Sequence, residues 1–172
     1  CALTHMVRVN DAEVDILAES GASVAHCPTT ALKVAYGVTQ VGKFPEMVQK
    51  GVNVSLGTDG NNASNYSDLM RASYLAAGIF KDAREDPQMF PAEKAFEMAT
   101  IDGAKTLLLD QEIGSLEIGK KADLVLHDTD RPEWRPLLNV MNQLIWSADG
   151  RGVHTVLVLS LIHISEPTRQ HW

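Results

Sequence analysis

The first 59 residues alternate between short apolar runs and amphipathic stretches, with only a few residues between them. Alternation of this kind predicts parallel strands joined by right-handed helical crossovers. Because the runs are mostly apolar, the sheet should be covered on both faces. The expected strands are Leu3–Val9, Ser23–Pro28 and Val52–Asp59, and the expected helices are Asn10–Ser20 and Pro45–Lys50.

Helices are also expected after Asp59. A polar loop, Gly60–Ser67, precedes an amphipathic helix over Asp68–Arg84, and the stretch from Pro91 is predicted to form two helices that separate near Asp102-Gly103. Between Pro28 and Gly42 we expect a loop, because proline interrupts a strand.

From Ile113 the pattern changes to glycine turns and β-forming runs. Strands are expected at Ala122–His127 and His154–Val158, which indicates part of a small β unit. Four residues here have structural interpretations: Trp134 and Trp146 should pack within the β unit, and His127 and His154 should lie on its surface.

Charge and composition exclude several classes of partner. The net charge is −7 with no cluster of Lys or Arg, which argues against nucleic acid. No apolar run approaches the roughly 20 residues of a membrane span. Cys1 and Cys27 form no CxxC pair, which fits a cytoplasmic protein.

Both ends of the chain are unusual. It begins without Met or a signal-peptide pattern, and Leu159–Arg169 resembles a translated sequencing adapter, with a genuine strand as the alternative. We therefore expect the natural sequence to end near Val158 and to be cut at both ends. This chain should be poorly soluble or only partly folded, because a truncated barrel exposes the edges of its outer strands. No function is assigned to His163 or His171 of the tail.

Three polar residues end three successive expected strands: His5, His26 and Asp59. Taken singly, each histidine is ordinarily a hydrogen-bonded core residue, and an Asp before Gly is ordinarily a turn former. Catalytic groups of parallel α/β barrels lie at the carboxyl ends of the strands, so three such residues in order favour a site.

These residues and three motifs resemble the amidohydrolase superfamily, in particular the branch of triazine hydrolases and S-adenosylhomocysteine/methylthioadenosine deaminases. The motifs are "HCPTTALKVAYGV" from His26, "LGTDG" around Asp59, and "GSLEIGKKADLVLHD" from Gly114. The resemblance implies an α/β fold. Residues 1–112 would form the C-terminal part (strands six to eight) of a (β/α)8 metal-dependent hydrolase barrel, residues 113–158 part of a small β-sandwich subdomain, and residues 159–172 a non-native tail.

The resemblance also implies roles for the strand-end residues. Asp59 would be a metal ligand and proton shuttle, His5 would contact the attacking water or the substrate, and His26 would lie behind the site or contact the substrate. The metal would be one divalent ion, zinc or alternatively iron, which lowers the pKa of bound water so that a carboxylate can take its proton.

Two departures from the family pattern limit this metal site. No His-x-His pair suited to metal binding occurs, so the remaining ligands would lie upstream of Cys1, and catalytic zinc normally needs about three protein ligands. The Ser-Asn pair usual in the family is Thr30-Ala31 here, which puts a substrate contact there in doubt. Downstream, Asn61, Asn62 and Ser64 are candidate substrate-binding residues, with a polar surface loop as the alternative.

The implied function is hydrolysis of a non-peptide C–N bond of a small heterocyclic amine by metal-activated water, as in a deaminase or aminohydrolase. Hydrolytic dehalogenation, cyclic-amide hydrolysis and a non-catalytic relative remain alternatives. The parent protein would be a homo-oligomer, and the fragment alone is expected to be inactive. P-loop, EF-hand and nucleophile-elbow patterns do not occur.

Overall fold

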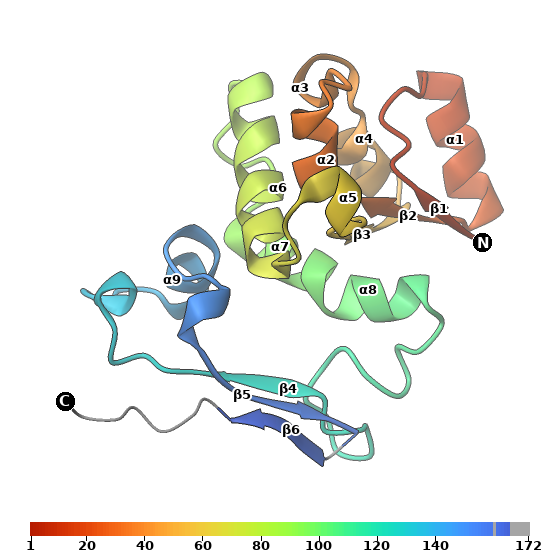
Figure 1. The fold of residues 1–172 in the computed structure, drawn as a ribbon. Coiled ribbons are helices and arrows are strands. Elements are labelled where there is room, and N and C mark those ends of the chain that lie inside the picture. Colours follow the sequence, from red (N-terminus) through yellow and green to blue (C-terminus); the bar gives the residue numbers. More distant parts are fainter. Residues whose placement is uncertain (160, 166–172) are drawn as a thin grey trace.

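The computed structural model describes residues 1–159 and 161–165. Its first part is a parallel sheet of β1 (Ala2–Thr4), β2 (Ser23–His26) and β3 (Asn53–Leu56), in the order β1-β2-β3 (Figure 1). Helix α1 (Asp11–Ser20) connects β1 to β2. Three helices connect β2 to β3: α2 (Pro28–Lys33), α3 (Val38–Val41) and α4 (Phe44–Gln49). The parallel arrangement predicted from the alternation is confirmed.

Local sequence signals define α1 at both of its ends. The Asn10 side chain accepts a hydrogen bond from the Glu13 amide (3.0 Å), and the Glu13 carboxylate accepts one from the Asn10 amide (2.7 Å). This reciprocal pair satisfies two amides that the first helical turn leaves free. At the other end Gly21 takes the left-handed conformation, which costs glycine little.

Three boundaries differ from the sequence prediction. The expected strand from Leu3 ends at Thr4, because the backbone turns left-handed at His5. The expected loop after Pro28 contains α2 and α3; Pro28 opens α2, where its missing N–H is not needed. The predicted separation near Asp102-Gly103 falls instead at Thr100, and Gly103 lies inside the second helix.

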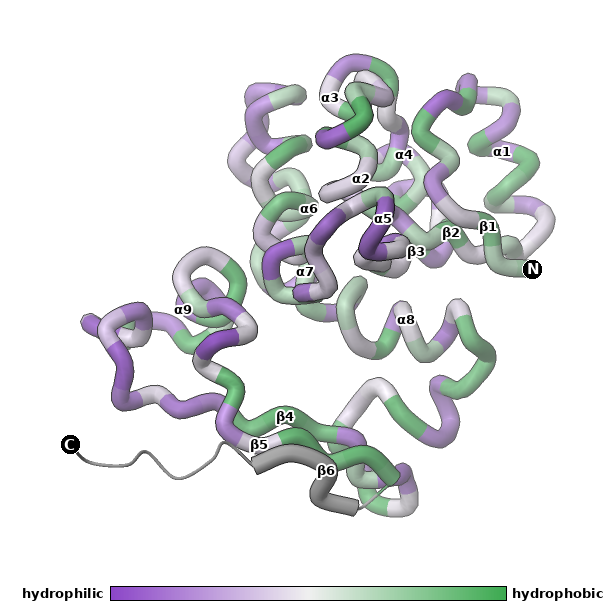
Figure 2. The backbone as a smooth tube through the Cα atoms, viewed as in Figure 1, coloured by the Kyte–Doolittle hydropathy of each residue, from purple (hydrophilic) through white to green (hydrophobic). Residues whose placement is uncertain are grey.

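The chain after β3 is helical. It forms α5 (Asn61–Ser64), α6 (Leu69–Ala83), α7 (Ala92–Ala99) and α8 (Ile101–Thr106). α5 lies within the predicted polar loop, so that prediction was wrong. The buried apolar residues of the sheet and of α1, α4 and α6 form one cluster that includes Val24, Val54, Phe44 and Phe80. Hydrophobic and hydrophilic residues alternate along these helices (Figure 2).

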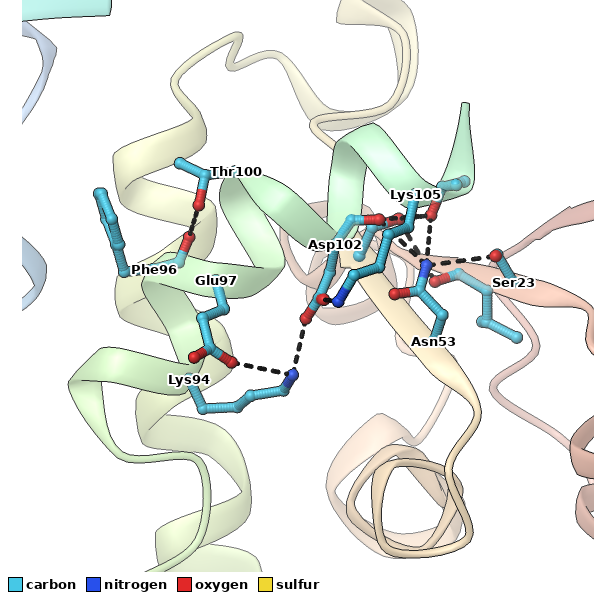
Figure 3. A network of polar contacts seen from close by, with 11 residues as sticks. Ser23, Asn53, Lys94, Phe96, Glu97, Thr100, Asp102 and Lys105 are labelled. Atoms are coloured by element: carbon cyan, nitrogen blue, oxygen red, sulfur yellow. Dashed lines mark hydrogen bonds and ion pairs between the residues drawn. The ribbon is translucent and has the colours of Figure 1, made fainter. Parts of the chain in front are cut away.

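A polar network joins α8 to the amino ends of β2 and β3 (Figure 3). The Asn53 amide donates to Ser23 Oγ (3.2 Å), to the Asp102 carbonyl (3.0 Å) and to Thr106 Oγ1 (3.0 Å). The Asp102 carboxylate, only 4% exposed, pairs with Lys94 (2.6 Å) and Lys105 (2.9 Å). This network holds the end of the sheet opposite to the strand-end residues.

The second part contains an antiparallel sheet of β4 (Leu124–His127), β5 (Val153–Val158) and β6 (Leu161–Ser165). Between β4 and β5 lie the 3₁₀ turns η1 (Pro132–Trp134) and η2 (Gly150–Gly152) and helix α9 (Val140–Trp146). β6 falls in the expected non-native tail. Pairing of this strand does not test its origin, and residues 166–172 of that tail lie outside the described residues.

The aromatic and histidine residues of this part only partly follow expectation. Trp134 is buried beside His127, their ring centroids 6.0 Å apart, so His127 is half-buried rather than on the surface. Trp146 packs against Tyr74 of α6 (5.4 Å between ring centroids), not within the β unit as predicted. His154 is exposed, as expected. In the described part of the chain, no helix combines the length and the apolar character needed to cross a membrane.

Candidate functional site

The carboxyl end of the parallel sheet brings two of the predicted residues together. His5 follows β1 directly and Asp59 lies three residues beyond β3. His5 Nε2 is 3.6 Å from Asp59 Oδ2, and the two side chains are 34% and 24% exposed. A small molecule can therefore reach the pair, and the two side chains are close enough to contact the same molecule.

Both residues of the pair have unusual backbone conformations. His5 has φ 72° and Asp59 has φ 61°, in the left-handed region that residues other than glycine seldom occupy. Such conformations persist only where the surrounding structure holds them, and they cluster at functional sites. The conformation lets Asp59 Oδ1 accept a hydrogen bond from the Gly60 amide (2.7 Å), while Oδ2 lies toward His5.

Asp59 is a carboxylate at neutral pH. The Gly60 amide bond is the main reason that the pKa of Asp59 lies below its ordinary value, followed by the Thr30 hydroxyl and then His5. Thr30 Oγ1 is buried and makes no hydrogen bond of normal geometry, so it lowers the pKa of Asp59 less than the Gly60 amide does. Asp59 is therefore negatively charged at neutral pH, and its Oδ2 could bind a cation or accept a proton.

His26 lies at the same sheet end but in the core. It is fully buried, its ring lies 3.9 Å from that of Phe44 between centroids, and neither ring nitrogen has a hydrogen-bond partner. Burial, followed by the proximity of His5, lowers the pKa of His26 to about 3, so the imidazole is neutral. This position does not support the predicted contact between His26 and substrate. A catalytic role for His26 stays a prediction.

The three predicted substrate-binding residues all belong to α5 but differ in exposure. Ser64 is buried, and its hydroxyl bonds within the loop to the Gly60 and Tyr66 carbonyls, so it does not face a ligand as predicted. Asn61 is exposed, although its Oδ1 already accepts a bond from Ser67 Oγ (2.5 Å). Asn62 is exposed, so of the three it remains the best candidate for contact with a substrate.

Sequence reasoning missed two residues beside the site. The Tyr36 ring meets that of His5 edge-on at 6.1 Å between centroids and is itself partly exposed. Lys33 reaches from α2 to α5. Both lie in the segment that begins with His26, but nothing in their spacing indicates where their side chains point.

The residues that the structure describes do not complete a metal site. Within the ranges 1–159 and 161–165, no group of three or more His, Cys, Asp or Glu side chains could hold a metal ion. Asp59 and His5 are two candidate donors, and catalytic zinc normally takes about three from protein. The pair fits one edge of such a centre, not the whole.

Comparison with known proteins identifies the family. The model of the amidohydrolase family matches residues 1–160. A 5-methylthioadenosine/S-adenosylhomocysteine deaminase of Moorella thermoacetica is 44% identical over 154 residues, which cover 90% of this chain and 35% of the relative. A 5'-deoxyadenosine deaminase of Methanosarcina acetivorans is 39% identical, with 90% and 34% covered.

Solved structures share this fold. An adenosine deaminase from Xanthomonas campestris with bound zinc has a TM-score of 0.86 at 34% identity, covering 94% of this chain and 36% of that one. A triazine hydrolase variant has a TM-score of 0.87 at 23% identity, covering 95% and 36%, and so supports the fold alone. The chain thus spans about a third of the length of the relatives it matches. On this evidence the chain belongs to the amidohydrolase family.

Proposed function

We propose that the chain is part of a metal-dependent hydrolase that cleaves a C–N bond of a heterocyclic amine, as a deaminase does. The observation that carries the proposal is the accessible His5–Asp59 pair, 3.6 Å apart at the carboxyl end of a parallel sheet. The deaminases among the relatives support the same chemistry.

The proposed whole protein contains a (β/α)8 barrel. In it β1, β2 and β3 are strands six to eight, residues 1–112 form the C-terminal part of the barrel, and residues 113–158 belong to a β-sandwich subdomain. The parallel order of the strands and the change to an antiparallel sheet at β4 support this division. Residues 159–172 are proposed as a non-native tail, and a cytoplasmic homo-oligomer is proposed from the family resemblance alone.

The proposed metal is zinc, as bound in the Xanthomonas relative, with iron as the alternative. Asp59 would contribute one ligand and the rest of the protein the others. A bound divalent ion would supply a Lewis acid that lowers the pKa of water.

Further roles can be proposed for residues of this chain from their own geometry. Asp59 is ionised, and Oδ2 is free to accept a proton and to return it to a leaving amine. His5, at 3.6 Å, lies where its Nε2 can hold a water or a substrate atom beside that carboxylate. Asn62 can contact a polar substituent.

The test is turnover by the full-length parent. Ammonia release is measured on purine nucleosides, pterins and triazines, and compared with Asp59→Asn. Loss of a proton shuttle should lower kcat by about 10² to 10⁴-fold. Unchanged turnover in the Asn variant with metal bound would refute the role assigned to Asp59.

The alternatives give different products in the same assay. Chloride release from a chlorinated triazine would indicate a dehalogenase, and ring opening of a cyclic amide would indicate an amide hydrolase. A parent protein that turns over none of these substrates, and that has no His-x-His pair upstream, would be a non-catalytic relative.

A further inference from the structure

α5 is a single helical turn that immediately follows Asp59. Its backbone bonds run from the Ala63 and Ser64 amides to the Gly60 carbonyl (both 2.9 Å) and from the Asn65 amide to Asn61 (3.0 Å). One turn is far below the roughly 12 residues at which a helix becomes stable alone. Contacts from elsewhere in the fold must therefore hold it.

Lys33 supplies such a contact from the last turn of α2. Its Nζ donates to the Ala63 carbonyl (2.8 Å) and also bonds Asn65 Oδ1. These acceptors lie at the carboxyl end of α5, where carbonyls lack helical partners and a positive charge is favourable. Asn65 there is left-handed, with φ 57°, so the ammonium group bridges the last turn and the residue that ends it.

The same helix touches the other side of this loop. Thr30, one turn before Lys33 on α2, is buried, and its hydroxyl lies near enough to Asp59 to lower the pKa of that carboxyl, although it makes no hydrogen bond of normal geometry. The Gly57 amide donates to the His26 carbonyl (2.9 Å), just before α2 begins. The segment from Gly57 to Asn65 is therefore held by the β2–α2 unit at both of its ends, with Asp59 between them.

We propose that Lys33 is a positioning residue, which holds α5 in place and thereby keeps Asp59 in its left-handed conformation facing His5. Lys33 itself does not touch the reacting atoms. Its importance for catalysis rests on the proposed function, whereas its effect on the loop does not.

The test is amide hydrogen exchange of this chain, followed at Ala63, Ser64 and Asn65. Lys33→Met should accelerate exchange at these three amides about three- to tenfold, because it removes two bonds of an exposed charged group. Lys33→Arg keeps a cation of similar reach and should restore most of the protection. The matched control is Lys50→Met, another lysine near the end of a short helix, which pairs with Asp15 instead and should leave the loop unchanged.

Several results would overturn the proposal: unchanged exchange in Lys33→Met, equal acceleration in Lys50→Met, or no protection from Lys33→Arg. If Lys33→Met fails to fold, Asn65→Gly removes one acceptor of Lys33, together with the Asn65 side-chain bond to the Asn61 carbonyl (2.9 Å), while allowing the left-handed backbone. It should then accelerate exchange at the Ala63 and Ser64 amides, and the absence of that effect counts equally against the proposal.

Kinetics of the full-length parent separate this proposal from the proposed function. If the protein is a deaminase, Lys33→Met should lower kcat more than it raises KM, and Lys33→Arg should recover kcat. Faster exchange in a parent without deaminase activity would refute the function and leave the positioning of the loop intact. Faster exchange with unchanged kcat and KM would refute the catalytic importance of Lys33.

Discussion

His5 Nε2 and Asp59 Oδ2 lie 3.6 Å apart although their strands are not neighbours: β2 runs between β1 and β3. The pair therefore spans the end of β2, whose own terminal residue, His26, is buried in the core. The two left-handed residues place their side chains over that strand end. This arrangement makes the backbone at His5 and Asp59 as important to the site as the side chains.

Asp59→Asn should leave the stability of the chain within about 0.5 kcal/mol of the original, whereas Asp59→Ala should cost about 1–2 kcal/mol. Asn tolerates the left-handed region and its Oδ1 can still accept the Gly60 amide bond, while Ala does neither. Denaturant unfolding measures both. Equal losses in the two variants would mean that the backbone conformation at Asp59 carries no such preference.

The stability of the chain should fall as the pH drops below about 6.5, because of His26. Its pKa is about 3 in the fold, against 6.5 for an exposed histidine, so the unfolded state takes up the proton first. The stabilising contribution of neutral His26 is complete above pH 6.5 and is lost as the pH falls, by about 2 kcal/mol between pH 7 and pH 5.

Unfolding curves at pH 7 and pH 5 test this dependence. His26→Leu should show a smaller loss between these two pH values than the original chain, whatever its stability at pH 7. The exposed His154→Leu is the control and should keep the original loss. A His26→Leu variant with the original pH dependence would contradict the assignment.

Asp68 joins the loop after Asp59 to the second part of the chain. One carboxylate oxygen caps α6 through the amides of Met70 (2.8 Å) and Arg71 (3.3 Å), and the other accepts from the Gly150 amide (2.9 Å). Asp68→Ala removes all three bonds and should cost about 2 kcal/mol.

Asp68→Asn separates the two tasks of this residue. Asn is as good a helix cap as Asp but presents an amide nitrogen where Gly150 needs an acceptor. It should therefore cost about 1 kcal/mol and accelerate hydrogen exchange at Gly150 without affecting Met70. If Asp68→Asn costs nothing, the bond to Gly150 contributes nothing to stability; if both variants cost the same, the helix cap contributes nothing.

Sequence predicted those features that depend on local signals. The helix predicted over Asn10–Ser20 agrees with α1, whose ends are set by Asn10 and Gly21, and the glycine turn located Asp59. Pro28 was ambiguous, since proline both ends strands and opens helices.

The burial and the contacts of individual side chains were harder to predict. Period-two alternation places His26 on the same face as the buried Val24, a signal that favoured the core but was outweighed by its place at a strand end. The contacts of Lys33 with α5 and of Trp146 with α6 join segments far apart in the chain, and no local pattern encodes them.

Asp102→Asn should be the most destabilising of these changes, by about 2–3 kcal/mol at pH 7. Burial would by itself raise the pKa of Asp102, but hydrogen bonds from Lys94 and then Lys105 lower it below the ordinary value of 3.8. A neutral amide cannot replace a buried carboxylate that pairs with two ammonium groups. Because the pKa of Asp102 is lower in the folded state than in the unfolded state, its ionised carboxylate stabilises the fold above pH 3.8. This stabilisation is lost as the pH falls through the pKa of the folded state. The difference in the free energy of unfolding between the original chain and Asp102→Asn should therefore become smaller at acid pH.

Lys105→Met provides the comparison, because Lys105 is half-exposed and Lys94 continues to pair with the carboxylate. Lys105→Met should lower the free energy of unfolding by less than about 1 kcal/mol. Unfolding of the three proteins in denaturant at pH 7 and pH 3 measures both effects. If Asp102→Asn costs no more than Lys105→Met at pH 7, the network in Figure 3 is held by Asn53 and Thr106 rather than by the buried charge.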